Sequence, residues 1–107
     1  MHIQINTDGN IDGTEKLAAH VKGVVESTLS RFSDRITRIE VHLSDQNGDK
    51  SGRDDKRCML EARLEGRQPT AVTHQAASLD EAVDGAAEKL KRTLETTLER
   101  LKDARRT

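Results

Sequence analysis

A long amphipathic segment at the end of the chain most constrains how this sequence can fold. Between residues 78 and 106 no proline interrupts an apolar pattern with three- and four-residue spacing, which is typical of one stripe of an α-helix. Ser78 can cap the first turn, and Glu81 follows three residues later as in a capping box. The pattern therefore predicts a helix that begins at residue 78 or 79. Its apolar residues are Leu79, Val83, Ala86, Leu90, Leu94 and Leu101.

Charge is divided unevenly along this predicted helix. Residues 78–88 contain acids and no base, whereas bases outnumber acids in residues 89–106. This order suits the helix dipole and can simply stabilise the helix. It can equally present a basic surface to an anionic partner, because Lys89, Arg92 and Arg100 line one flank beside the apolar stripe. Both interpretations are compatible with burial of the stripe.

Length and composition predict one domain that spans residues 1–107 and has a single two-layer core. Phe32 is the only aromatic residue, so the core must consist of aliphatic side chains. Charged residues make up 35% of the chain and hydrophobic residues 33%. Oligomerisation or binding of a partner would help to stabilise the fold of so polar a chain. The net charge of −1 excludes a simple polycationic nucleic-acid binder. Any phosphate contact must therefore come from locally clustered bases.

Three features of the sequence favour a soluble cytoplasmic protein. Cys58 is the only cysteine and cannot form an internal disulfide. No charged-then-apolar leader opens the chain. No apolar run approaches the roughly 20 residues of a membrane-spanning helix. We therefore expect no contact with a membrane.

The rest of the chain predicts a second helix and four strands. Residues 14–32 place apolar side chains near one helical face, and Ser33 and Asp34 end that helix. Apolar and polar residues alternate in four segments, whereas the polar stretch from about 45 to 57 predicts a mobile loop. The alternating segments are residues 2–6, 36–45, 58–65 and 70–77. The fold class is therefore an α/β (α+β) two-layer sandwich, β-α-β-β-β-α, with both helices on one face of a four-stranded sheet.

No group of residues in the sequence predicts catalysis or metal binding. The histidines and Cys58 lack the close paired spacing of metal ligands, and no pair of carboxylates stands apart in an apolar setting. Cys58 is expected to be a small buried hydrophobe. His74 is expected to point towards the helices, either as a core histidine bonded to a backbone group or as a switch or ligand. We expect no enzyme activity, metal, cofactor or small-molecule substrate.

Three segments carry a family resemblance that extends over essentially the whole chain. They are the start of the first helix at Thr14, Glu15 and Leu17, residues 31–36 (RFSDRI), and residues 82–94 (AVDGAAEKLKRTL). The last segment is the characteristic one. In these segments the chain resembles the ribosome hibernation factors, the short hibernation-promoting and ribosome-associated inhibitor proteins of the sigma-54 modulation and S30EA type.

The resemblance implies the same β-α-β-β-β-α fold and a place in the decoding channel of the small ribosomal subunit. There, basic residues of both helices would contact 16S rRNA and block messenger and transfer RNA, so that translation is restrained under stress by occlusion and without catalysis. The rRNA-binding residues that it implies are Lys89, Arg92, Arg100 and Lys102 on the last helix, and Arg31 and Arg35 after the first.

The sequence departs from the family pattern at several positions. Asp80 stands where a tyrosine is usual, Thr96 and Leu98 stand where bases are common, and residues 23–27 (GVVES) are not basic. Each lost base removes about one phosphate contact. A second interpretation is therefore a divergent paralogue that acts as a protein-interaction or regulatory module without binding ribosomes, able to form a homodimer through the exposed sheet face. We expect no second domain of the kind with which long members of the family pair two ribosomes.

Overall fold

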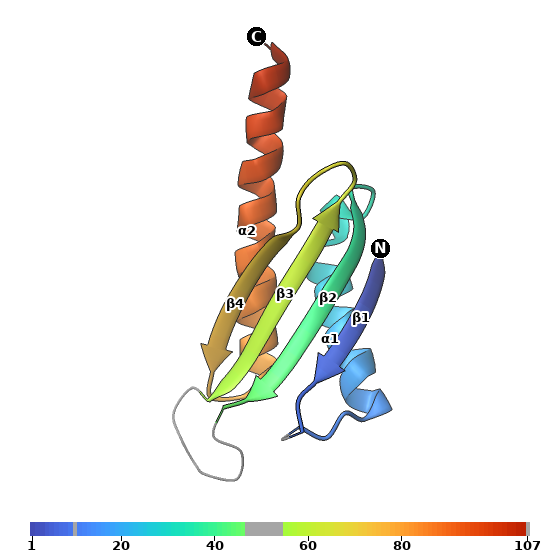
Figure 1. Ribbon diagram of the computed structural model, residues 1–107, viewed down its shortest axis with the longest axis vertical. Helices are drawn as coiled ribbons and strands as arrows, with labels where there is room; N and C mark the ends of the chain where they lie inside the picture. Colours follow the sequence, from blue (N-terminus) through green and yellow to red (C-terminus); the bar gives the residue numbers. More distant parts are fainter. Residues whose placement is uncertain (10, 47–54, 107) are drawn as a thin grey trace.

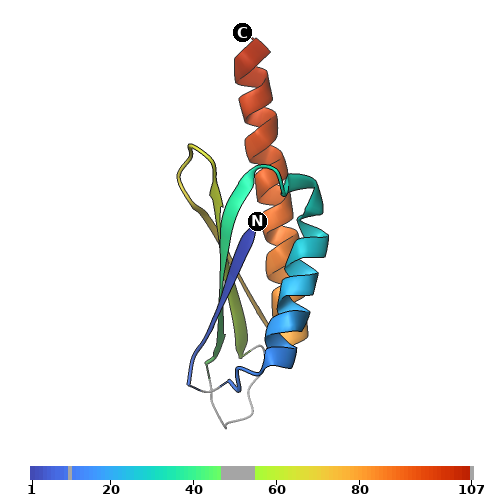
Figure 2. The same ribbon diagram turned by 90° about the vertical axis from the view of Figure 1, so that its right-hand side faces the viewer.

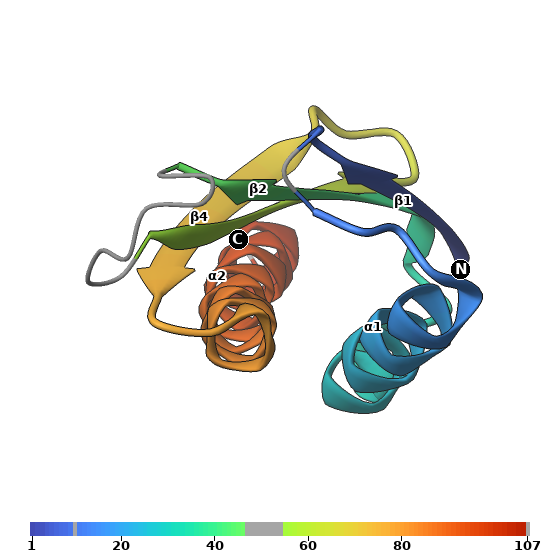
Figure 3. The same ribbon diagram turned by 90° about the horizontal axis from the view of Figure 1, so that it is seen from below.

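The computed structural model describes residues 1–9, 11–46 and 55–106, with side chains up to residue 102. In this part of the chain a four-stranded sheet carries two helices on one face (Figures 1 and 3). The predicted fold class and element order are confirmed. The elements are β1 (His2–Thr7), α1 (Glu15–Thr28), a 3₁₀ turn η1 (Ser30–Phe32), β2 (Ile36–Asp45), β3 (Lys56–Leu64), β4 (Thr70–Ala76) and α2 (Leu79–Arg106).

The strands lie in the sheet in the order β1-β2-β3-β4. β1 pairs with β2 in parallel, and α1 supplies the crossover that a parallel pair needs. The other two pairs are antiparallel. Gly66 has a φ of 73° in the turn between β3 and β4, a conformation that glycine adopts without strain. Pro69 precedes β4, which is an edge strand, so that the proline removes no hydrogen bond from the sheet.

Side-chain caps set the first residue of each helix. The Thr14 hydroxyl accepts a hydrogen bond from the Leu17 N–H at 3.0 Å, and the Ser78 hydroxyl accepts one from the Glu81 N–H at 3.1 Å. A hydroxyl in this position satisfies one of the N–H groups that the first helical turn leaves without a partner. The cap that the sequence predicts at Ser78 is therefore confirmed.

The first helix ends earlier than the sequence predicts. α1 stops at Thr28, and η1 then carries the chain to Phe32. Leu29 has left the helical conformation at φ −104° and ψ 15°, and the Phe32 N–H bonds to its carbonyl at 2.9 Å. Tightening into a 3₁₀ turn is common at a helix end. Apolar spacing could not reveal it, because a continued helix would also bury Phe32.

The predicted loop of about residues 45–57 is too long at its second end, whereas its first end agrees with the predicted strand of residues 36–45. β2 includes Asp45 and β3 begins at Lys56, while residues 47–54 lie outside the described part of the chain. The Lys56 ammonium lies 3.2 Å from the Asp45 carboxylate and 2.9 Å from that of Asp55, and both aspartates are buried. The hydrogen bond to Asp55 is the main cause that raises the pKa of Lys56 above its ordinary 10.5. The charged residues at this end of β2 and β3 are therefore paired with one another.

An aliphatic core fills the space between the sheet and the two helices. The alternation predicted for the strands is confirmed, since their apolar side chains are buried. The two helices cover one face of the sheet (Figure 3). Phe32, the only aromatic residue of the sequence, lies in this core. The side chains that are less than 2% exposed include Val21, Val25 and Leu29 beneath α1, Ile39, Val41, Cys58 and Leu60 on the sheet, and Val83, Leu90 and Leu94 on α2.

The second helix is longer than the sheet that it covers. Its 28 residues span about 42 Å at 1.5 Å per residue, and its last turns extend beyond the end of the sheet (Figure 2). We call residues 79–94 the packed segment of α2 and residues 95–106 its projecting segment. Among residues 95–102 no side chain is buried, whereas Leu90 and Leu94 are fully buried. The structure thus separates a helix that the sequence predicts as one amphipathic unit into two parts.

Candidate nucleic-acid interface

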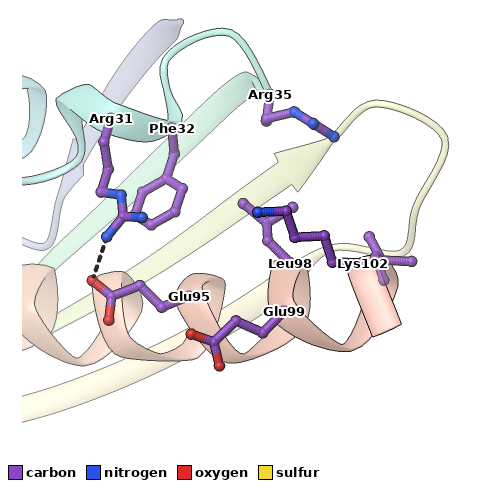
Figure 4. A pocket seen from close by; sticks show the side chains of 8 residues that line it. Arg31, Phe32, Arg35, Glu95, Leu98, Glu99 and Lys102 are labelled. Carbon is purple, nitrogen blue, oxygen red and sulfur yellow. Dashed lines mark hydrogen bonds and ion pairs between the residues drawn. The ribbon is translucent and has the colours of Figure 1, made fainter. Parts of the chain in front are cut away.

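The six predicted rRNA-binding residues fall into two groups in the structure. Arg31, Arg35 and Lys102 surround one cleft between η1, the start of β2 and the projecting segment of α2 (Figure 4). The other three are exposed on α2 and do not line this cleft. This second group is Lys89, Arg92 and Arg100. Periodicity placed the second group on one flank of the helix, but only the fold brings the first group together.

The cleft has an apolar floor and a charged rim. Its volume is about 350 Å³, and Phe32, Leu98 and Leu101 form its apolar part. The rim residues are Arg31, Arg35, Lys102, Glu95 and Glu99. A cleft of this kind can exclude water from a flat apolar group while charged atoms remain available at the edge.

Arg31 is the base of the cleft that has a carboxylate partner among the described residues. Its Nη1 atom lies 3.2 Å from Glu95 Oε1, and its guanidinium carbon lies 5.1 Å from the centroid of the Phe32 ring (Figure 4). The side chain nevertheless stays 66% exposed. In the described part of the chain neither Arg35 nor Lys102 pairs with a carboxylate. Their charges are therefore free to meet an anion.

A second hollow adjoins the cleft and adds a base that the sequence did not single out. It has a volume of about 230 Å³ and shares Arg35, Leu98 and Leu101 with the cleft. Arg67 lines it from the turn between β3 and β4. In the sequence Arg67 is one polar residue between two predicted strands, and no pattern there indicates that this segment lies beside α2.

Lys89 occupies a different environment from the other predicted residues. Its ammonium donates a hydrogen bond to the Thr73 carbonyl of β4 at 2.9 Å. Because β4 is an edge strand, this carbonyl would otherwise face solvent. Lys89 therefore covers part of the sheet edge. Arg92 and Arg100 are exposed and, among the described residues, form no ion pair.

Bases on the outer face of the sheet are largely paired with acids. Arg38 lies 3.0 Å from Glu40 and also bonds to Gln4, and Arg63 lies 3.7 Å from Glu61. Such pairs reduce the positive charge that the face can present to a phosphate. In the described part of the chain, Met1 is the only large apolar side chain that is exposed. The predicted homodimer through this face would therefore be a polar one.

His74 points towards α2, as its place in the alternation predicts. A Cβ atom on Gly85 would lie 2.1 Å from Cδ2 of His74, so the imidazole fills the space beside this glycine. No hydrogen bond to His74 occurs among the described residues, so the interpretation as a histidine bonded to a backbone group is wrong here. The imidazole therefore packs against α2 at the position where Gly85 has no Cβ atom.

Asp80 also has a structural partner. Its carboxylate lies 3.1 Å from Nε2 of His20, so the pair links α1 to the start of α2. Both side chains are more than half exposed, with fractions of 52% for His20 and 72% for Asp80. An exposed pair of this kind contributes little to stability. The residue that departs from the family pattern therefore takes a modest part in the contact between the helices.

The described residues offer little for catalysis or metal binding. Cys58 is fully buried, and burial raises the pKa of its thiol to about 12, which keeps it protonated and unreactive near neutral pH. No group of three or more potential ligands is placed to hold a metal ion in this part of the chain. None of the described helices is both long enough and apolar enough to cross a membrane.

These features define a class of protein: a small α/β sandwich whose helical side carries unpaired bases and a projecting basic helix end. The chain belongs to the sigma-54 modulation protein / S30EA ribosomal protein family, whose model matches residues 3–102. No curated protein matched the sequence.

Two solved structures share the fold. The N-terminal domain of Protein Y from Thermus thermophilus has a TM-score of 0.72 and 21% sequence identity, over 91% of this chain and 99% of that one. A ribosomal subunit interface protein from Coxiella burnetii has a TM-score of 0.72 and 20% identity, over 92% of this chain and 99% of that one. At this level of identity the two comparisons establish the fold alone.

Proposed function

We propose that this protein is a non-catalytic, ribosome-associated factor of the cytoplasm that binds rRNA of the small subunit near the decoding channel. It restrains translation under stress by occupying the path of messenger and transfer RNA. The family to which the chain belongs is described as sigma-54 modulation protein / S30EA ribosomal protein, and this description supports the proposal. One of the two structures with the same fold is described as a ribosomal subunit interface protein.

The observation that carries the proposal is the distribution of unpaired bases. On the outer sheet face Arg38 and Arg63 are matched with acids and Arg57 is not, whereas Arg35, Arg92 and Lys102 on the helical side all have no carboxylate partner among the described residues. Binding to a nucleic-acid backbone depends on charges that are free to replace counterions. The helical side, and the projecting segment above all, therefore offers the better surface for RNA despite the net charge of −1.

The shape of the molecule supports the same surface. A single helix of roughly 10–12 Å diameter can enter a narrow channel that a sheet with two helices cannot. The last turns of α2 form such a helix, because they extend beyond the end of the sheet (Figure 2). Contacts from Arg92 and Arg100 would be with phosphates, which position a protein without reading sequence. Phosphate contacts of this kind are sufficient for occlusion, which requires no recognition of base sequence.

Sedimentation through sucrose gradients with purified 30S and 70S particles tests the proposal. We expect the protein to travel with 30S or 70S particles at low salt and to be released as salt rises, because the contacts are with phosphates. The double variant Arg92→Glu, Arg100→Glu should lose this co-sedimentation. The matched double variant Arg57→Glu, Arg63→Glu changes the same charge on the outer sheet face and should retain it. A wild-type protein that stays at the top of the gradient at low salt would contradict the proposal.

A further inference from the structure

We propose that the cleft between η1 and the projecting segment of α2 holds one unstacked nucleotide of single-stranded RNA. The base would lie on the guanidinium plane of Arg31, and the phosphate would contact Arg35 and Lys102. This inference deepens the proposed function and rests on it, because it takes RNA as the partner.

The environment of Arg31 suits a stacking platform better than a phosphate clamp. Glu95 holds the guanidinium at 3.2 Å, and the Phe32 ring supports it at 5.1 Å. The ion pair offsets the charge of Arg31, which weakens its attraction for a phosphate. It also fixes the orientation of a planar group that is still 66% exposed. Bases in single-stranded RNA stack on such guanidinium planes as well as on aromatic rings.

The phosphate belongs on the opposite side of the cleft. Arg35 and Lys102 are exposed there and have no carboxylate partner among the described residues. Figure 4 shows Arg35 and Lys102 on the side of the cleft away from Arg31 and Glu95. Glu95 and Glu99 line the remaining rim and would repel a phosphate placed near them. The charges therefore allow one orientation of a nucleotide.

The volume and the floor fit one base. A cleft of about 350 Å³ lies at the small end of the range for ligand sites, so it suits one nucleotide rather than two. Leu98 and Leu101 are half-buried and supply apolar contact for the ring. Glu99 has no partner among the described residues and can accept a hydrogen bond from an exocyclic amino group. The cleft should therefore prefer cytosine to uracil.

The test measures binding of fluorescent single-stranded oligonucleotides by anisotropy at low salt. Arg31→Lys keeps the charge and removes the plane, so it should weaken binding of oligoadenylate about tenfold. Binding of an abasic strand of equal length should stay as in the wild type. Arg63→Lys makes the same replacement at an ion-paired arginine of the outer sheet face, outside the cleft, and should change neither. Thermal unfolding of Arg31→Lys should match the wild type, since the pair with Glu95 is exposed.

A second pair of strands tests the role of Glu99. Oligocytidylate should bind several-fold more tightly than oligouridylate, and Glu99→Gln should remove this difference. Equal binding of the two strands by the wild type would contradict the assignment of Glu99.

The results separate failure of the cleft from failure of the proposed function. If the wild type binds the abasic strand as tightly as oligoadenylate, or Arg31→Lys behaves as the wild type, the nucleotide site is overturned. The same holds if the protein co-sediments with 30S particles but binds no oligonucleotide, and the proposed function then stands. If it neither binds oligonucleotides nor co-sediments at low salt, both proposals fall.

Discussion

The two segments of α2 belong to one continuous helix and yet have different physical roles. The packed segment carries the fully buried Leu90 and Leu94 and gives up a Cβ at Gly85 to admit His74. The projecting segment buries no described side chain, and at its base Glu95 forms an exposed ion pair with Arg31 of η1. Stability should therefore depend on the first segment and binding on the second. The comparison shows how a small core can be combined with a surface that stays free for a partner.

The largest effect on stability is expected at alkaline pH, through the buried thiol of Cys58 in the sheet beneath the packed segment. Cys58 pairs in register with His74, which touches Gly85. Burial raises the pKa of the Cys58 thiol from 9.0 to about 12. The folded state therefore keeps a proton that the unfolded chain releases, so stability falls as pH rises from 9.0 towards 12, by up to about 4 kcal/mol. Urea unfolding of the wild type and of Cys58→Ala across this range measures the difference; parallel pH profiles would contradict it.

Truncation of leucines compares the two segments directly. Leu90→Ala should lower the free energy of unfolding by about 3 kcal/mol, because it leaves a cavity in a fully buried site. Leu98→Ala should cost about 1 kcal/mol, because its side chain is only half-buried. Chemical denaturation of both variants checks this order. Equal losses would mean that the projecting segment is as much a part of the core as the packed one.

The same replacement at two glycines should have opposite signs. Gly85→Ala places a Cβ 2.1 Å from the His74 ring and should destabilise the protein by about 2 kcal/mol. Gly23→Ala in α1 meets nothing within 4 Å and should stabilise by up to about 1 kcal/mol through helix propensity. Adding His74→Ala to Gly85→Ala should recover part of the loss. A stabilising effect of Gly85→Ala alone would show that the imidazole moves aside freely.

The smallest effect is expected at the base of the projecting segment. A double-mutant cycle with Arg31→Ala and Glu95→Ala should give a coupling energy below about 1 kcal/mol, because both side chains remain partly exposed. Thermal or chemical denaturation of the four proteins measures it. A coupling of several kcal/mol would show that this ion pair holds the helix in place and would weaken the distinction between the segments.

Sequence patterns predicted the helices and strands well because apolar residues recur with different periods in the two kinds of element. A spacing of three and four residues located α2 with its Ser78 cap, and alternation located β2 with its bounds. The patterns failed where a contact between distant residues decides the structure. The early end of α1 coincides with a 3₁₀ turn, and β3 begins earlier than predicted at Lys56, which pairs with Asp45.

The candidate site was predicted less well than the fold. A helical wheel placed Lys89 on a basic flank, but its bond to the Thr73 carbonyl depends on which strand forms the sheet edge. The cleft needs Arg31 and Lys102, which are far apart in the sequence, and a wheel for one helix cannot bring them together. Arg67 joins them from a turn that carries no periodic pattern.

The affinity for purified 30S particles of a double charge reversal in the cleft tests the central claim most directly. The variant Arg35→Glu, Lys102→Glu removes two bases next to the projecting segment, and Arg57→Glu, Arg63→Glu removes two from the outer sheet face. The account predicts that the first variant binds far more weakly, with a shallower dependence of affinity on salt because two phosphate contacts are lost. It predicts wild-type affinity for the second. Equal affinities, or a greater loss in the second variant, would contradict the account.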